Sequence, residues 1–448
     1  MLRSVAVIAT TLFVIITLAS GAAQAAPRAL TIDDAVALAL RSNPQLASAR
    51  SRVTASDYGA SSTGRRMLPS IHLNEELQEW NAPFAITFPI PMGSSPVSIF
   101  TVRDKTTNTF SASADQPVLG LLKTNAQRES QDEGTEAARA QIAAFQADLR
   151  ANVETQFLRV FEAQALEQIA TASVNELGDQ VTVAKARLAS GVITNADLLR
   201  IEVAVANAQQ QGLEAHSQAL TARAALFAAI GIGPTDAAEL TLVEPADRLA
   251  AARTRATSSV ASPTLDAVLP RAQARRPEIA QQNHLVLSAE RQSSAGGYAL
   301  LPDVDLEAAY LRIDGNPFSP KNSAYVGLKA SWAIWEWGAT DLQRRAANAQ
   351  AEAARRDRDM LERQIESELT ASLAQGDAAR GAVGSAEKAV ASAQEAYRVT
   401  DAALKAGTAT TTDLLESQSE LTQARLNLIR AQYELVLSDV ALTRASGG

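Results

Sequence analysis

The sequence predicts a mainly helical fold that also carries a few β-strands of the membrane-spanning type. Three observations support this prediction. The chain contains one long pattern twice, it has two long stretches without proline, and segments of alternating polarity precede these stretches. We therefore expect the chain to be an internal duplication of a unit made of a helix, a β-hairpin and a long helical hairpin.

The duplication is visible at both ends of the repeated pattern. Residues 31–47 (TIDDAVALALRSNPQLA) align with residues 264–280 (TLDAVLPRAQARRPEIA). Residues 188–199 (LASGVITNADLL) align with residues 404–415 (LKAGTATTTDLL). The two alignments differ by one insertion in the first copy. A repeat of this length indicates two copies of one structural unit.

The first 25 residues are expected to be a signal peptide. Arg3 is followed by the apolar segment VAVIATTLFVIITLA, and Ala23-Gln24-Ala25 forms a small-residue cleavage site. The alternative is a membrane anchor, for which the apolar segment is short. We therefore expect an exported protein.

The composition excludes several classes of function. The chain has no cysteine, which removes disulfides, thiol catalysis and cysteine-ligated metals. Its formal net charge of −8 argues against nucleic acid as a partner. The three histidines, His72, His216 and His284, lie in no metal or catalytic motif. We expect neither an enzyme nor a cofactor or metal site.

Each proline-free stretch is expected to form a helical hairpin. Proline inside a helix costs about 3 kcal/mol, so its absence permits very long helices. Each stretch is interrupted once, at the segment SGVITNAD or AGTATTTD, where Gly191 or Gly407 is typical of a position just after a helix C-terminus. Asp197 and Asp413 follow and are the predicted N-caps of the returning helices.

The segments before the hairpins alternate in polarity. Val304, Leu306 and Tyr310 alternate with polar residues, and a second such segment follows the turn-rich sequence DGNPFSPKN. These segments have the length and period of transmembrane β-strands. The first copy alternates less regularly, since Glu75 falls on its apolar side, and its two strands are joined by the long proline-rich segment NAPFAITFPIPMGSSPVSIF, which we expect to be an external loop.

Four strands cannot close a barrel, and lipid does not tolerate an open sheet edge. Either helices cover a soluble sheet, or several chains pool their strands. Helices of roughly 100 Å extend far beyond strands of about 30 Å, so they point away from the sheet. Pooling of strands is therefore the favoured interpretation.

The predicted organisation follows the repeat. Residues 1–25 are the signal peptide, 26–233 the first repeat, 234–263 a linker or equatorial segment, and 264–448 the second repeat. The predicted strands cover about 69–80, 106–117, 302–313 and 322–333, and the predicted helical hairpins cover about 118–231 and 334–446.

Tryptophans cluster at the end of the last predicted strand, where Trp332, Trp335 and Trp337 lie close together. Such a cluster is often ordinary core or a sugar-binding platform. At the end of a lipid-type strand, however, we interpret it as an interfacial aromatic belt.

The order of these motifs resembles the TolC family of outer-membrane efflux channels. The resemblance rests on the export signal, the segment LTIDDAVALALRSNPQL, the strand LPSIHL, the LxxGxxTxxDLL tip and the second copy with RRPEIA, and it covers essentially the whole mature chain. It implies a homotrimer in the outer membrane of a Gram-negative bacterium. A 12-stranded β-barrel would continue into a 12-helix periplasmic α-barrel, with residues 234–263 and the C-terminal tail forming an equatorial collar.

The resemblance also implies partners. The hairpin tips would contact a periplasmic adaptor, or membrane fusion protein, which links the channel to an inner-membrane pump of the RND or ABC type. The tip residues that this implies are Gly191, Thr194, Asp197, Gly407, Thr410 and Asp413.

The resemblance further implies an acidic constriction at the periplasmic entrance. Asp413 and Glu416 lie on one helix face, and threefold symmetry would bring together six carboxylates that favour cations. Arg200 occupies the position of Glu416 in the first repeat and could pair with the ring. The alternative is a solvated helix face. The tip sequence GTATTT offers no tyrosine or basic residue for closing contacts, which leaves the means of closure open.

The expected function is the passive exit duct of a tripartite efflux pump. One alternative is the outer-membrane channel of a type I protein secretion system. A more distant alternative is a periplasmic coiled-coil scaffold or adaptor, which would not explain the lipid-type strands. A secreted sugar-binding or hydrolytic enzyme would leave the duplication unexplained.

Overall fold

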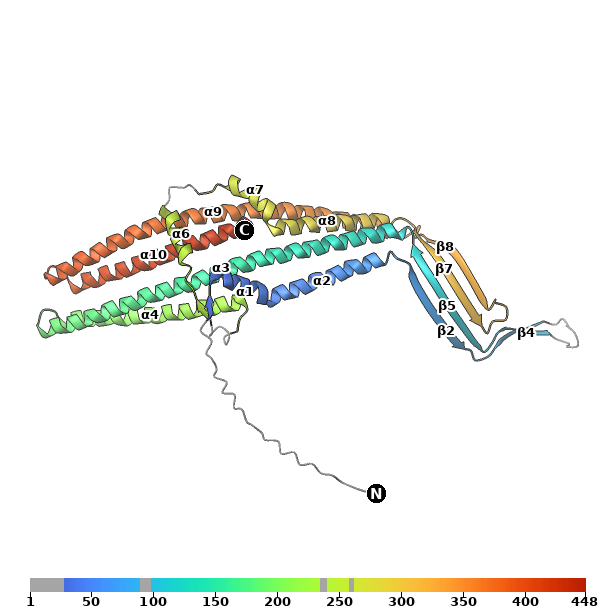
Figure 1. Cartoon of the computed structure of the whole chain (residues 1–448), viewed down its shortest axis with the longest axis horizontal. Coiled ribbons are helices and arrows are strands. Elements are labelled where there is room, and N and C mark those ends of the chain that lie inside the picture. The colour runs from blue at the N-terminus through green and yellow to red at the C-terminus, as the bar shows by residue number, and fades with distance from the viewer. Residues whose placement is uncertain (1–27, 89–97, 234–239, 258–261) are drawn as a thin grey trace, which may run out of the picture.

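The computed structural model describes residues 28–88, 98–233, 240–257 and 262–448. The predicted signal peptide and parts of the predicted external loop and linker lie outside these ranges. Within them the molecule is elongated, with a β-sheet at one end and two helical tips at the other (Figure 1).

The sheet consists of four antiparallel strands in the order β2-β5-β7-β8. The strands are β2 (Ser70–Glu79), β5 (Thr106–Pro117), β7 (Asp303–Asp314) and β8 (Asn322–Ser331). The central pair, β5 and β7, joins the two repeats, so β2 and β8 are the edge strands. Each repeat therefore contributes one inner and one edge strand.

The strand register explains the position of Glu75. Leu73 pairs with Ala112, which pairs with Tyr310, and this row lies on the apolar face. The next row on the same face is Glu75, Phe110 and Arg312. Glu75 thus lies near the middle of β2, in a row of this face that also contains Arg312.

The insertion of the first repeat is partly a second β-hairpin, which corrects the expectation of a loop. Strands β3 (Phe84–Phe88) and β4 (Ser98–Arg103) pair in antiparallel fashion beyond the main sheet. At the base of this hairpin the Arg103 guanidinium lies over the Trp80 ring, 3.5 Å from its centroid. The proline-rich composition of the segment suggested a loop, but Pro83 precedes β3 and the other three prolines lie between β3 and β4 in the sequence, so no proline falls within either strand.

Two long helical hairpins extend away from the sheet. The first pairs α3 (Gly120–Ala189) with α4 (Asn195–Ile230), and the second pairs α9 (Ala339–Lys405) with α10 (Thr411–Ala445). The 70 residues of α3 span about 105 Å. Within the described ranges no helix is both long and apolar enough to cross a membrane.

Two shorter helices precede the sheet strands in each repeat, where the sequence predicted one. These are α1 (Ile32–Ser42) and α2 (Pro44–Arg65) in the first repeat, and α7 (Leu265–Arg275) and α8 (Pro277–Tyr298) in the second. Asn43 and Arg276 break the helices with extended ψ values of 118° and 122°. The cause is the following proline, which disfavours the helical conformation of the residue before it.

The waist of the molecule lies where α1 meets the hairpins. Strand β1 (Arg28–Leu30) pairs in parallel with β6 (Leu240–Leu242), and α6 (Ala246–Thr257) crosses the layer. Arg248 of α6 lies 3.1 Å from Glu154 and 3.4 Å from Asp33, while Arg255 lies 2.5 Å from Asp439 of α10. Helix α6, between the two repeats, thus forms ion pairs with one helix of each hairpin. Helix α10 ends at Ala445, close to the predicted end of the second hairpin at about residue 446.

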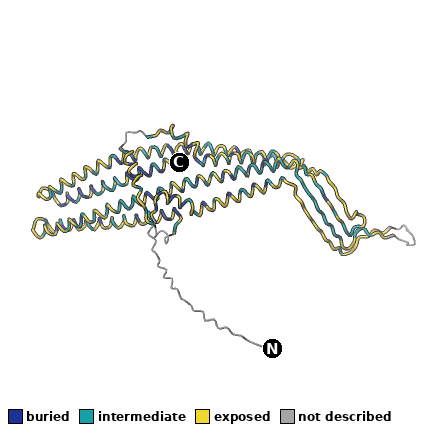
Figure 2. Tube along the Cα trace, viewed as in Figure 1, coloured by how far each residue is buried: buried dark blue, intermediate teal, exposed yellow. Residues whose placement is uncertain are grey.

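The main hydrophobic core also lies at the waist. Phe157, Leu158 and Val160 of α3 are fully buried against apolar side chains of α1 and α10. Tyr433 of α10 belongs to the same cluster, and its burial raises the pKa of the hydroxyl to about 12. In Figure 2 the buried positions are densest at the waist, whereas the sheet and the tips are largely exposed.

A partly buried cluster of charged residues lies on the side of the second repeat. Arg276, from the RRPEIA segment, is 6% exposed and lies 2.6 Å from Glu368 and 3.3 Å from Glu278. Arg444 contacts Glu278 as well, and also Asp148 of α3 at 2.7 Å. These pairs connect α3, α8, α9 and α10 at one height.

The helices form a single layer with two free edges (Figure 1). Between the sheet and the waist the order is α2, α3, α8 and α9, and from the waist to the tips it is α4, α3, α10 and α9. Edge helices α2 and α4 belong to the first repeat, and edge helix α9 belongs to the second. The chain is therefore an open strip along its whole length.

Candidate functional site at the hairpin tips

Both hairpins turn in the same way. Gly191 and Gly407 adopt the left-handed backbone conformation, with φ of 74° and 77°. The amide of the next residue donates a 2.9 Å hydrogen bond back to the carbonyl of Arg187 in the first tip and of Ala403 in the second. Left-handed φ favours glycine, which explains why glycine recurs here.

The returning helices are capped by threonine, which corrects the prediction that aspartate is the N-cap. Thr194 Oγ1 accepts from the Asp197 amide at 3.3 Å, and Asp197 Oδ2 accepts from the Thr194 amide at 3.0 Å. Thr410 and Asp413 form the same reciprocal pair at 3.2 and 2.8 Å. This is a capping box in which Asp stands at the third helical position. The T-x-x-D spacing in the sequence was the signal for it.

The capping hydrogen bonds lower the pKa values of the two aspartates. The Thr410 amide and hydroxyl both donate to Asp413, and they hold the pKa of Asp413 below its ordinary value of 3.8. Hydrogen bonds from the Thr194 hydroxyl and amide likewise lower the pKa of Asp197. Both groups are therefore ionised across the physiological range.

The residues expected at the entrance constriction lie on exposed positions. Asp413 and Glu416 are exposed on the first turns of α10. Arg200 of α4 reaches across to the second hairpin, where its guanidinium donates a 3.1 Å hydrogen bond to Thr412 Oγ1. It also lies 3.8 Å from Asp197 on its own helix. Among the residues described here, no ion pair joins Arg200 to Asp413 or Glu416.

A small apolar cluster packs the tips together. Ala184, Leu198 and Ile201 of the first hairpin are buried, and Leu415 of the second hairpin packs against them. On α10 the buried face continues through Leu414 and neighbouring residues. The two tips are therefore one packed unit rather than two independent hairpins.

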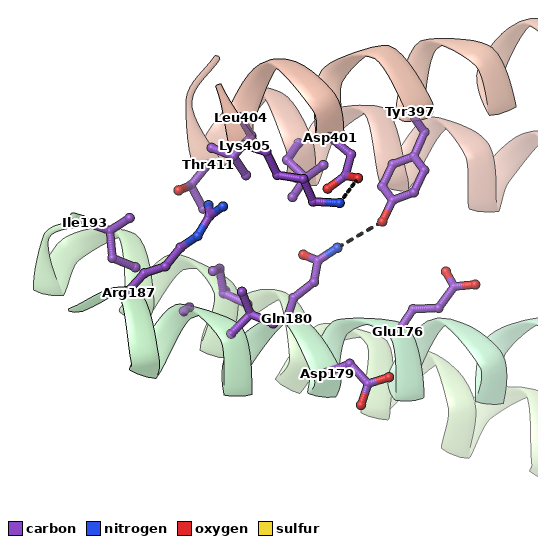
Figure 3. A pocket seen from close by; sticks show the side chains of 14 residues that line it. Glu176, Asp179, Gln180, Arg187, Ile193, Tyr397, Asp401, Leu404, Lys405 and Thr411 are labelled. Atoms are coloured by element: carbon purple, nitrogen blue, oxygen red, sulfur yellow. Dashed lines mark hydrogen bonds and ion pairs between the residues drawn. The ribbon is translucent and has the colours of Figure 1, made fainter. Parts of the chain in front are cut away.

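A polar network joins the hairpins farther from the tips (Figure 3). The Gln180 side-chain amide donates to Gln418 Oε1 at 2.6 Å and to the Tyr397 hydroxyl at 3.3 Å. Gln418, which is 2% exposed, donates to Glu176 at 3.5 Å, and Arg425 lies 3.4 Å from the same carboxylate. Sequence reasoning missed these residues because nothing in helical periodicity shows which polar side chains meet across hairpins.

The predicted aromatic belt follows β8. Trp332, Trp335 and Trp337 are 61%, 75% and 86% exposed, and the last two rings meet edge-on with centroids 5.6 Å apart. The Trp332 indole donates to the Leu300 carbonyl at 3.3 Å. Trp337 has a φ of 55°, an uncommon conformation for a bulky residue. The backbone turn into α9 therefore holds this ring outward.

Two of the three histidines contact carboxylates on a neighbouring helix. His216 of α4 and His284 of α8 each place Nδ1 2.7 Å from a carboxylate of α3, Glu167 and Glu133 respectively. In the described part of the chain, no three histidine or acidic side chains come together as a group that could hold a metal ion.

A family model described as "Outer membrane efflux protein" matches residues 35–232 and 268–448. The chain therefore belongs to the outer membrane efflux protein family. This confirms the family and the outer-membrane location that the sequence motifs predicted.

Curated relatives match part of the chain. Outer membrane efflux protein BepC of Brucella suis is 24% identical over 294 residues, which cover 65% of this chain and 61% of the relative. Outer membrane protein TolC of Vibrio cholerae is 26% identical over 185 residues, which cover 38% and 42% respectively. The chain thus aligns with less than two thirds of the length of either relative.

Solved structures match the fold along nearly its whole length. The outer membrane protein VceC of Vibrio cholerae gives a TM-score of 0.78 at 18% identity, covering 93% of this chain and 96% of that one. The open state of the MtrE outer membrane channel of Neisseria gonorrhoeae gives 0.73 at 18% identity, covering 94% and 89%. CusC gives 0.77 at 15% identity, covering 93% and 92%. These likenesses confirm the predicted fold class.

Proposed function

We propose that the chain is one protomer of a homotrimeric outer-membrane exit duct, which passively conducts substrates delivered by a periplasmic adaptor and an inner-membrane pump of the RND or ABC type. The observation that carries this proposal is the open strip. Every level of the molecule, from strands to tips, has one free edge from the first repeat and one from the second.

Because the two edges differ, we expect the first-repeat edge of one copy to meet the second-repeat edge of another. Edge β2 can pair with β8 of another copy, and edge α4 can pack on α9 of another copy. Contacts of this heterologous kind close into a ring when the rotation allows it, and closure removes the unpaired strand edges. The number three rests on the family resemblance.

Edge helix α4 carries an apolar stripe that supports association. Leu199, Val203, Leu213 and Leu220 are each more than half exposed. They recur at heptad-like spacing, as expected for a helix that packs against another helix. Large exposed apolar patches normally mark interaction sites, so this stripe supports packing of α4 against another chain.

The tips form the periplasmic entrance in this proposal. The rigid turns at Gly191 and Gly407, with the capping boxes that follow, are the surfaces for the adaptor. Asp413 and Glu416 from three copies line the constriction, and Arg200 lies beside it. The contacts of Gln180 with Gln418 and Tyr397, together with the Arg425–Glu176 pair, hold the two hairpins of each chain together and keep the entrance narrow.

The tryptophan cluster anchors the sheet at the lipid interface. Trp332, Trp335 and Trp337 lie between the end of β8 and the start of α9, where a membrane-spanning sheet would meet the periplasmic headgroups. Trp is suited to this position because its ring is apolar and its N–H is polar.

Planar-bilayer recording of the purified full-length protein tests the proposal. The expected result is an outer-membrane, detergent-soluble trimer that opens cation-preferring channels and binds a purified adaptor through its tips. A monomer recovered in the soluble periplasmic fraction would instead support the scaffold alternative and would end the channel proposal.

A further inference from the structure

A cavity of about 340 Å³ lies between the two hairpins near their tips (Figure 3). Both hairpins line it. Its walls are mainly apolar, and the apolar lining residues are Val183, Ala184, Ile193, Ile201, Leu404 and Leu414. This volume is within the range of pockets that bind small organic molecules, about 300 to 1,000 Å³.

Of the five charged residues that line the cavity, Glu176, Asp401 and Lys405 have ion-pair partners. Lys405 lies 2.6 Å from Asp401, and Glu176 is engaged by Arg425. The Arg187 guanidinium is half-buried, and Figure 3 shows it reaching from α3 toward the second hairpin, beside Ile193 and Thr411. Within the described ranges Arg187 has no ion pair, so its positive charge is available to a ligand.

The remaining acidic residue does not offset this charge. Figure 3 shows the Asp179 carboxylate on the side of α3 that faces away from the second hairpin, whereas Gln180 points into the gap. The cavity therefore has an apolar body with a cationic end.

The opposite end of the cavity offers neutral hydrogen-bonding groups. Gln180 uses its amide N–H groups on Tyr397 and Gln418, and its carbonyl oxygen is buried with no donor among the described residues. The Tyr397 hydroxyl accepts from Gln180, which leaves its own proton for another acceptor. A buried carbonyl without a donor is costly unless a ligand or water satisfies it.

We propose that this cavity binds a small amphipathic organic anion, such as an aromatic sulfonate or carboxylate. The anionic group pairs with Arg187, and the ring lies against Val183, Leu404 and Leu414. The planar guanidinium suits such an oxyanion because it donates two parallel hydrogen bonds.

Occupancy would stabilise the observed arrangement of the hairpins, because the ligand contacts both. A ligand that binds one arrangement better than another shifts the population toward it. This consequence rests on the proposed channel function, in which contacts between the two hairpins keep the entrance narrow. The binding itself does not depend on that function.

Equilibrium dialysis with the full-length protein in lipid nanodiscs tests the site. The probes are naphthalene-1-sulfonate, the neutral 1-naphthalenemethanol and the cationic 1-naphthylmethylammonium, with empty nanodiscs as the partition blank. We expect saturable binding of the sulfonate at one site per chain and at least tenfold weaker binding of the other two.

Three variants make the test specific. Arg187→Gln should weaken sulfonate binding at least tenfold, and Val183→Trp should abolish it by filling the cavity while every charge is retained. Lys185→Gln removes an exposed positive charge from the same helix but outside the cavity, and should leave binding unchanged.

Equal binding of the cation, unchanged binding by Arg187→Gln, or an equal loss in Lys185→Gln would each overturn the proposal. Bilayer conductance is recorded on the same preparations. A protein that binds the sulfonate through Arg187 but opens no channel would contradict the proposed function and leave the binding site standing.

Discussion

Gln180 of the first hairpin donates a 2.6 Å hydrogen bond to the side-chain carbonyl oxygen of Gln418 of the second. Gln418 is almost fully buried, so water cannot replace this contact while the hairpins stay together. The bond joins two residues that occupy the inner helices α3 and α10 of the layer. It therefore reports directly on whether the two repeats remain side by side near the entrance.

Replacing Gln418 by leucine should loosen the contact between the hairpins. The change leaves the Gln180 amide without its closer acceptor and removes a donor to Glu176, which we expect to cost about 1 to 3 kcal/mol. Single-channel recording should then show a larger or more frequently open conductance. The matched control is Gln423→Leu, since Gln423 is exposed on the same helix and its side chain donates to Asn427 of that helix rather than across the hairpins. Equal behaviour of the two variants would contradict the role given to Gln418.

The acidic constriction is tested by ion selectivity. The double variant Asp413→Ala, Glu416→Ala should lose most of the cation preference and the block by divalent ions, because a ring of carboxylates favours cations. Glu387→Gln, on an exposed position of α9 farther from the tip, should retain both properties. Unchanged selectivity in the double variant would remove Asp413 and Glu416 from the constriction.

The Thr410 cap gives a prediction about pH. A carboxylate whose pKa is lower in the folded state contributes stability that is complete above its unfolded pKa and is lost as pH falls through the lowered value. Protection of the first turn of α10 should therefore persist as the pH is lowered past 3.8, the ordinary pKa of Asp413. Thr410→Ala removes the hydroxyl donor and should move the loss of protection to higher pH, as measured by hydrogen exchange.

Ser419→Ala serves as the comparison for Thr410→Ala, since Ser419 is exposed on the same helix and outside the capping box. Its exchange profile should match that of the unaltered protein. A shift of the same size in both variants would show that the capping box does not set the pH dependence.

Replacement by alanine should destabilise the protein at a turn glycine and stabilise it at a glycine inside a helix. Gly407→Ala forces a side chain into the left-handed conformation, which we expect to destabilise the tip by about 1 kcal/mol. Gly178→Ala lies inside α3, where an added Cβ meets nothing within 4 Å, and should stabilise by about 0.5 to 1 kcal/mol. Local unfolding free energies from hydrogen exchange measure both. Changes of the same sign would be inconsistent with the turn geometry.

Trp337 allows the interfacial belt to be tested. Trp337→Gly removes the unfavourable left-handed φ of a bulky residue and should raise thermal stability in detergent or leave it unchanged. The same change should weaken anchoring in lipid.

The depth of the tryptophan cluster can be measured separately. With Trp80→Phe as background, fluorescence quenching by brominated lipids should report Trp332, Trp335 and Trp337 at headgroup depth, and quenching only at the bilayer centre would contradict the belt.

Local rules predicted the repeated units well, because each long element carries its own signal. The absence of proline between Lys321 and the C-terminus, and the alternation that starts at Val304, indicated a helical hairpin and a strand where α9, α10 and β7 lie. The left-handed turn at Gly407 followed from the same reasoning. The N-cap was wrong by three residues because Asp413 was taken alone, without the threonine that completes the box.

Contacts between distant segments could not be predicted in this way. The positions of Gln180 and Gln418 are set by the packing of α3 on α10. Arg276 likewise meets Glu368 and the Ala445 carbonyl only because α9 and α10, far along the chain, pack beside it. The chain also gives no local sign that Arg187 ends at a cavity. These features depend on tertiary arrangement, and periodicity carries no information about it.

Disulfide trapping between the two sheet edges tests the central claim most directly, and the absence of native cysteine makes it clean. Cysteine at Leu73 of β2 is combined in turn with cysteine at Ala324, Val326 or Leu328 of β8. Within one chain these strands are separated by two others, at about 4.8 Å per strand, which is too far for a disulfide. We predict that at least one pair gives a covalent ladder that ends at three chains, while the single-cysteine variants remain monomeric on denaturing gels. A ladder that continues beyond three chains, or no crosslinked species for any pair in the membrane fraction, would contradict the closed trimer.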